Sequence, residues 1–166
     1  ELRRELAHLF IDLARYDDAR RHIDASLRRA RSRLGRDHVA VALLLNAAGM
    51  LCKYSGRYAA GRRFYLRALR IIEPRATSPE LLAELATLHH NLGGLAHARG
   101  RFAEALPHAR RAVELRTTLH SADSLEVAIE RAALAPILDA LAPDDPESLV
   151  IYRDVIATFE RLDEPY

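Results

Sequence analysis

The chain has 166 residues, of which 49% are apolar and 29% are charged, a balance typical of a folded domain rather than a disordered segment. The net charge of +2 is small, and no apolar run approaches the roughly 18 residues that span a bilayer, so we expect no membrane association. Cys52 is the only cysteine, which excludes an internal disulfide and favours a reducing compartment. With no secretory signal at the N-terminus, a cytoplasmic protein is expected.

Helical periodicity runs along the whole chain, and the β-branched alternation typical of strands is nearly absent. The pattern predicts helices over residues 2–14, 17–34, 38–55, 79–98, 102–120, 124–141 and 146–162. Ser78 followed by Pro79 is typical of a helix N-cap, and the segment Asp123-Ser124-Leu125-Glu126 resembles a capping box.

A short turn motif occurs three times between the predicted helices. Its copies are Leu13-Ala14-Arg15-Tyr16, Ser55-Gly56-Arg57-Tyr58 and Arg99-Gly100-Arg101-Phe102. The aromatic residue recurs after 42 and then 44 residues, and each copy follows one helix-patterned stretch and opens another. A helix–turn–helix unit repeated at this period predicts an all-α solenoid.

Small residues recur in the same register as the turns. Before each turn a small residue precedes a leucine by two positions: Ala7 and Leu9, Gly49 and Leu51, Gly93 and Leu95. After each turn a small residue recurs, at Ser26, Ala68 and Ala112. In the first two copies it stands at helical spacing from a bulkier residue, Ile23 or Tyr65. Because two antiparallel helices approach closely only where one presents a small side chain, these positions predict the helix contacts within each unit.

The pattern resembles the kinesin light chain-type tetratricopeptide repeat, whose units are about 42 residues long. The similarity extends to the linker Leu34-Gly35-Arg36-Asp37-His38, to the helix start Leu45-Asn46-Ala47, and to Pro107 in the second helix of a unit. The resemblance implies a right-handed superhelical solenoid of antiparallel helix pairs, with about three and a half to four repeats. The units of this single array over 1–166 are about 1–36, 37–77, 78–121 and 122–162.

The fourth unit is degenerate. Asp145 stands where the repeat would place an aromatic residue, and Asp145-Pro146 indicates an N-cap with proline in the first helical turn. Pro136 occupies the small-residue position of the preceding helix, so we expect a kink or a late helix start there.

The resemblance implies that the first helix of each pair lines a concave groove, formed here mainly by units two and three. The predicted ligand-binding residues are Asn46, Met50, Lys53, Tyr54, His90, Asn91, Gly94 and His97; unit four would add Glu130, Ala133 and Ile137. Asn91 is expected on an open surface, where its amide would donate and accept hydrogen bonds with a peptide backbone. The alternative is a polar residue between helices. Gly94 would let a ligand approach closely, or is a tolerated helix defect.

No catalytic constellation, phosphate loop or paired-cysteine motif occurs, so we expect no enzyme and no cofactor. His90 and His97 share a helix face but are separated by about 10.5 Å of rise, too far for one metal ion. The arginines between residues 15 and 36 could hold phosphates or an acidic partner. They lie on a second helix without interleaved aromatic residues, so no nucleic-acid partner is expected. Cys52 is predicted to be buried, and packing roles are predicted for Tyr58, Phe64, Tyr65, Phe102 and Phe159.

The function predicted is a protein–protein interaction module that binds a peptide or a partner helix in the concave groove. Two alternatives stay open at this stage. One is a ligand-sensing regulatory domain of a larger signalling or transcription-control protein. The other is a structural array that self-associates through an exposed end repeat, giving a homo-oligomer.

Overall fold

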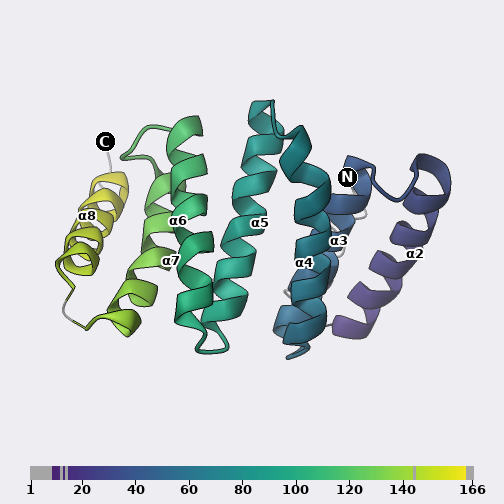
Figure 1. Ribbon diagram of the computed structural model, residues 1–166, viewed down its shortest axis with the longest axis horizontal. Coiled ribbons are helices and arrows are strands. Elements are labelled where there is room, and N and C mark those ends of the chain that lie inside the picture. The colour runs from purple at the N-terminus through teal and green to yellow at the C-terminus, as the bar shows by residue number, and fades with distance from the viewer. Residues whose placement is uncertain (1–8, 12, 14, 144, 164–166) are drawn as a thin grey trace. The chain divides into compact units, whose positions relative to one another are not determined.

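Figure 1 shows the computed structural model, which describes residues 9–11, 13, 15–143 and 145–163. Within these ranges every regular element is a helix, which confirms the predicted all-α helical repeat fold. The chain divides into two compact units, Glu1–Ala76 and Thr77–Tyr166, and each is described by itself.

The first unit contains α2 (Tyr16–Leu34), α3 (Val39–Tyr54), α4 (Tyr58–Ile72) and the short 3₁₀ helix η1 (Glu73–Arg75). Helix α3 packs against both α2 and α4. The predicted ranges 17–34 and 38–55 match α2 and α3 within one residue. Most of the predicted helix 2–14 lies outside the described residues; residues 9–11 are helical and residue 13 is in a turn.

Helix α4 is absent from the seven predicted ranges, although the turn motif implied a second helix after Tyr58. Its buried face consists of Gly61, Tyr65, Ala68, Ile71 and Ile72. Aromatic and β-branched residues have lower helix propensity than alanine, and here tertiary packing against α3 outweighs that preference.

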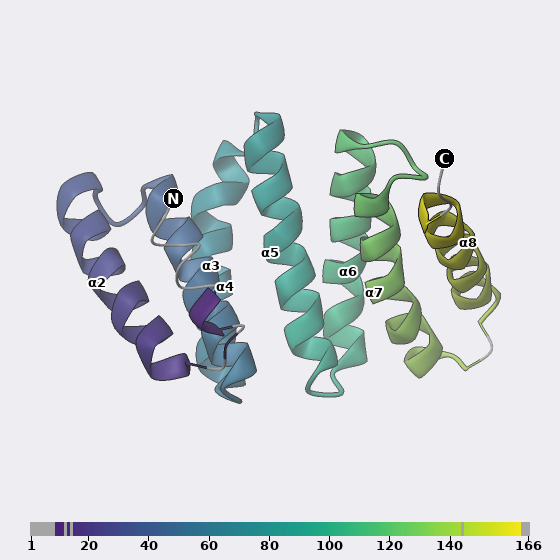
Figure 2. The ribbon, with the colours of Figure 1, turned by 180° about the vertical axis from the view of Figure 1, so that it is seen from behind.

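The second unit contains α5 (Pro79–His97), α6 (Phe102–Leu119), α7 (Leu125–Leu141) and α8 (Pro146–Asp163). Helix α5 packs mainly against α6, α6 also packs against α7, and α7 against α8. Helix α7 therefore lies between α6 and α8, as both views show (Figure 1, Figure 2). The predicted ranges agree with all four helices to within one residue.

The turns inside the α3–α4 and α5–α6 pairs have the same geometry. Gly56 and Gly100 have φ angles of 72° and 65°, values in the left-handed region that glycine adopts without strain. The amide of the following arginine then donates back across the turn to the preceding helix. These bonds run from Arg57 N to Cys52 O (2.7 Å) and from Arg101 N to Ala96 O (3.0 Å). This is the Schellman end of a helix, and it explains why glycine recurs in these two copies of the motif.

Glycine provides the close helix contacts that the repeat predicted. A Cβ atom at Gly49 would lie 2.4–2.8 Å from ring atoms of Tyr65, and one at Gly93 would lie 3.3 Å from the backbone nitrogen of Ala109. The paired leucines Leu51 and Leu95 are buried. For the first unit the prediction is wrong: Leu9 is 52% exposed and does not fill a helix contact.

Side-chain caps define where several helices begin. The Ser78 hydroxyl accepts from Leu81 N (3.4 Å) and the Ser124 hydroxyl from Val127 N (3.3 Å). The predicted capping box is wrong, because Ser124 is the N-cap and the residue three places later is Val127 rather than a glutamate. The late start predicted near Pro136 is also wrong: the capped turn starts α7 at Leu125, and the helix continues through the proline.

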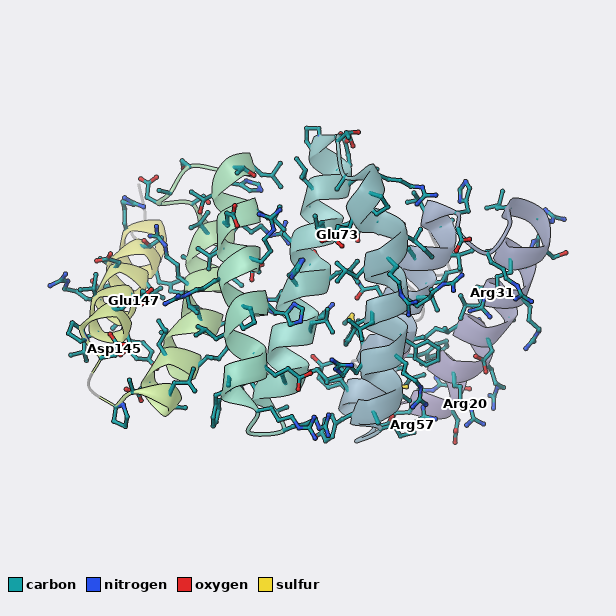
Figure 3. The ribbon with its side chains drawn as sticks, viewed as in Figure 1. Arg20, Arg31, Arg57, Glu73, Asp145 and Glu147 are labelled. Carbon is teal, nitrogen blue, oxygen red and sulfur yellow. The ribbon has the colours of Figure 1, made fainter. Side chains whose placement is uncertain are left out.

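The degenerate fourth unit begins its second helix as predicted. Asp145 Oδ1 accepts from Glu147 N (2.8 Å), and Figure 3 labels both residues at the start of α8. Of the predicted packing residues, Tyr65 is fully buried, whereas Phe159 on α8 is 42% exposed and contradicts the prediction. Cys52 is buried as predicted, and burial raises the pKa of its thiol.

Candidate interaction surface

One stripe of accessible residues runs along α5: Ala83, Thr87, His90 and Gly94 are half-exposed and His97 is exposed. Steps of four and three residues keep these positions on one helix face. The opposite side of α5 is fully buried, with leucines at positions 85, 88, 92 and 95. Three of the predicted ligand-binding residues, at positions 90, 94 and 97, therefore share a face that the protein leaves accessible.

Asn91 does not lie on an open surface, so that expectation is wrong, and the predicted groove residue Asn46 is buried as well. Asn91 is 8% exposed and Asn46 is 7% exposed. Asn91 stands one helical turn before Leu95, so it faces the packed side of α5 rather than the stripe. Both amides take part in interactions within the protein, as buried polar groups generally must.

A buried carboxylate joins three helices beneath the α5 stripe. Glu130 of α7 is 4% exposed, and its Oε2 atom lies 2.7 Å from His90 Nδ1 on α5. Its Oε1 atom accepts a hydrogen bond of 3.3 Å from Arg116 Nε on α6. Because a buried charge is costly unless paired, these two partners account for the burial of Glu130.

The same network reaches the next position of the stripe. Arg116 Nη2 donates to Thr87 Oγ1 (3.0 Å), and that hydroxyl donates in turn to the carbonyl of Ala83 (3.0 Å). Thr87 and His90 are therefore held in place from behind by α6 and α7. A side chain ordered in this way loses little conformational entropy when a partner binds.

Sequence reasoning placed Glu130 and Ile137 in the groove and did not single out Arg116. The structure buries Glu130 and Ile137, at 4% and 2% exposure. Ala133 is half-exposed. The available signal was Glu130 within the mainly apolar stretch Val127 to Leu138, where Arg131 is the only other charged residue, since an acidic side chain on a buried helix face needs a partner.

A histidine pair lies on the packed side of α5. His89 is 8% exposed, and its Nδ1 atom lies 3.0 Å from His108 Nδ1 on α6. Burial first, then the charges of His108 and Arg111, lower the pKa of His89 to about 4, so the ring is neutral at physiological pH. Among the residues that the structure describes, no three histidine, cysteine or carboxylate side chains are grouped as a metal site would need.

In the first unit, the predicted ligand-binding residues on α3 differ in how exposed they are. Met50 and Lys53 are half-buried and Tyr54 is 55% exposed. The Lys53 ammonium lies 5.9 Å from the centre of the Tyr54 ring, and burial lowers the pKa of that lysine. The accessible end of α3 thus presents an aromatic ring beside a cation.

Two family models, both described as tetratricopeptide repeat, match this sequence over residues 1–73 and 85–126. The chain belongs to the tetratricopeptide repeat family. The aromatic residues that set its repeat length, Tyr16, Tyr58 and Phe102, are the first residues of α2, α4 and α6. The aromatic residues of this tetratricopeptide repeat protein recur after 42 and then 44 residues.

A solved structure shares the fold. BtubC (BKLC) from P. vanneervenii is similar with a TM-score of 0.81 and 19% identity, over 97% of this chain. This chain spans 63% of the length of BtubC. A protein of nearly identical TPR-like repeats from Podosopora anserina, named after kinesin light chain, has a TM-score of 0.48 and 12% identity over 98% of this chain and 96% of its own.

The search of curated proteins returned no match. In the described part of the chain, none of the helices combines the length and the apolar character required to cross a lipid bilayer.

Proposed function

We propose that this tetratricopeptide repeat protein is an interaction module that binds an extended peptide or a partner helix on the accessible faces of its first helices. The family membership supports a protein partner in general. The observation that carries the finer proposal is the α5 stripe, where the accessible side chains of Thr87 and His90 bond to Arg116 and to the buried Glu130. This arrangement suits a binding surface, because side chains that are already ordered in the folded protein lose less conformational entropy when a partner binds.

The proposed contacts on α5 are His90, Gly94 and His97. His97 is exposed at the C-terminal end of the helix, and its ring packs edge-on against Phe102 with centroids 5.5 Å apart. On α3 the proposed contacts are Met50, Lys53 and Tyr54, where the aromatic ring offers both apolar area and a hydroxyl. Asn46 and Asn91 are left out of the direct contacts because both are buried.

As part of the same proposal, the protein acts by binding rather than catalysis, and it acts in the cytoplasm. The single thiol, Cys52, is buried with a raised pKa, which makes it a poor nucleophile. A reduced, unpaired cysteine is also usual for the cytoplasm.

Self-association is a second candidate function, favoured by α8. Its residues Leu149, Tyr152, Ile156 and Phe159 are 37–56% exposed and recur at heptad spacing along one face. A second copy of this chain could cover that face through the same helix. Sedimentation of wild type and of Ile156→Glu tests this idea. A mass that rises with concentration in wild type but not in the variant supports self-association, and a wild-type monomer at all concentrations excludes it.

The leading proposal is tested by affinity capture from the native host with wild type and with Tyr54→Ala/His97→Ala. Both residues are exposed at helix ends, so the variant should fold normally. The control is Arg28→Ala/Arg29→Ala, two exposed positions on the second helix α2. A partner retained by the control and lost by the test variant supports the proposal. A partner lost only by the control would place binding on the α2 surface instead.

A further inference from the structure

A separate basic pocket lies in the first unit, away from the helix faces discussed above. It has a volume of about 340 Å³, and its lining includes Arg31, Arg36 and Arg67. Arg31 comes from the last turns of α2, Arg36 from the turn that follows, and Arg67 from α4. Arg31 is labelled in Figure 3. Three segments of the chain thus bring guanidinium groups to one small cavity.

These charges are only partly neutralised within the protein. Arg67 Nη2 on α4 pairs at 2.7 Å with Oδ1 of Asp37, which lies in the turn between α2 and α3. Among the described residues, no hydrogen bond or ion pair engages the side chain of Arg31 or Arg36. One carboxylate against three guanidinium groups leaves two positive charges at the pocket.

Helix stability explains only one of the three arginines. A cation in the last turn of a helix interacts favourably with the partial negative charge there, which suits Arg31 on α2. Arg36 lies beyond that helix, and Arg67 lies in the middle of another. Bringing like charges together is unfavourable unless an anion compensates them. Helix α3, which begins three residues after Arg36, has no acidic residue in its first turn to do so.

We propose that this pocket binds a phosphoryl group. A phosphate monoester carries about −1.5 to −2 charges at pH 7, which matches the two unneutralised charges. The planar fork of arginine donates pairs of hydrogen bonds to phosphate oxygens, and arginine is the preferred residue for this geometry. A volume of about 340 Å³ is at the small end of ligand pockets, so it suits one compact anionic group. The group belongs either to free phosphate or to a phosphorylated side chain.

The test is an NMR titration of the full chain with inorganic phosphate at constant ionic strength, maintained with sodium chloride. Saturable shifts are expected for the amides of residues 31–37 and for Arg67. Arg31→Gln/Arg36→Gln should weaken phosphate binding by about tenfold or more, because it removes two positive charges and the charge-assisted hydrogen bonds that they would donate. The matched control, Arg28→Gln/Arg29→Gln, removes the same charge from exposed positions of α2 and should bind as wild type does.

A second arm compares a short peptide carrying one phosphoserine with its unphosphorylated counterpart. Tighter binding of the phosphopeptide than of inorganic phosphate would assign the group to a modified protein, and equal binding would assign it to the free anion. Shifts that do not saturate, or that both arginine variants weaken equally, would overturn the proposal and reduce the effect to general charge screening.

Discussion

At the scale of single residues, Gly49 and Tyr65 form a close contact between α3 and α4. A Cβ atom at position 49 would lie within 2.8 Å of three ring atoms of the fully buried Tyr65. Gly49→Ala should therefore lower the free energy of unfolding by about 1–3 kcal/mol, as overpacking does, despite the better helix propensity of alanine. Urea unfolding measures the loss.

The matching control is the same substitution in a Tyr65→Leu background. Removing the ring opens the space that the new methyl group needs, so the cost of Gly49→Ala should shrink there. If the cost were the same in both backgrounds, the contact with Tyr65 would not be its cause.

The Tyr65 hydroxyl is a second residue-scale case. It is buried and has no hydrogen-bond partner among the described residues, and burial raises the pKa of the phenol. Tyr65→Phe should therefore change stability by no more than about 1 kcal/mol, with stabilisation as the expected sign. A loss above about 2 kcal/mol in chemical denaturation would mean that the hydroxyl has a bonded partner.

The residue scale is also where sequence reasoning was weakest. Helical spacing placed His90 and Asn91 together, yet one is half-exposed and the other is 8% exposed. Adjacent helical positions differ by about 100°, so the edge of a buried face falls between them. Where that edge lies depends on how α6 and α7 pack against α5, and the packing arrangement of the helices cannot be read from one sequence.

At the scale of elements, the Glu130 network ties α5, α6 and α7 together. Glu130→Ala would leave Arg116 and His90 without their shared acceptor, and Arg116 is itself only 18% exposed. The expected loss in the free energy of unfolding is about 2–4 kcal/mol. Thermal and urea unfolding both measure it.

Glu126→Ala provides the matched control, since Glu126 stands one turn earlier on α7 with 49% side-chain exposure. Its loss should be much smaller than that of Glu130→Ala, because surface ion pairs contribute little to stability. Equal losses in the two variants would show that the network adds nothing beyond helix propensity.

Most elements could be predicted because their signals are local. The caps at Ser78 and Asp145 and the glycine turns at Gly56 and Gly100 are encoded within a few residues. Helix α4 was missed as a range because its Phe64-Tyr65 core and β-branched end are poor helix formers that packing overrides. The Glu130 network connects residues up to 40 positions apart, beyond the reach of any local pattern.

At the scale of the whole molecule, His89 makes stability depend on pH. Its pKa is about 4 when folded and ordinarily 6.5, so the folded state favours the neutral ring. The contribution to stability is complete above pH 6.5 and is lost as pH falls from 6.5 towards 4, because only the unfolded chain then gains the proton easily. The total loss over this window is about 3 kcal/mol.

The measurement is urea unfolding at pH 7 and at pH 4.5, with His89→Leu as the comparison. The variant should lose less stability than wild type between pH 7 and pH 4.5, because the two proteins have all their other titratable groups in common. Parallel losses would contradict the role of His89.

The helical repeat fold followed from the 42- and 44-residue recurrence, which the family matches confirm. That recurrence also predicts one continuous array of four units over residues 1–166, which stays a prediction. The binding surface depends on a partner, and neither periodicity nor burial encodes its identity.

The most direct test of the central claim is hydroxyl-radical footprinting of the chain alone and in complex with its captured partner. Binding on the first helices predicts that Met50, Tyr54 and His97 become protected, while Tyr152 on α8 and the exposed residues of α2 react as before. Protection confined to α2, α4 and α6, with Tyr54 and His97 unchanged, would contradict the proposed surface.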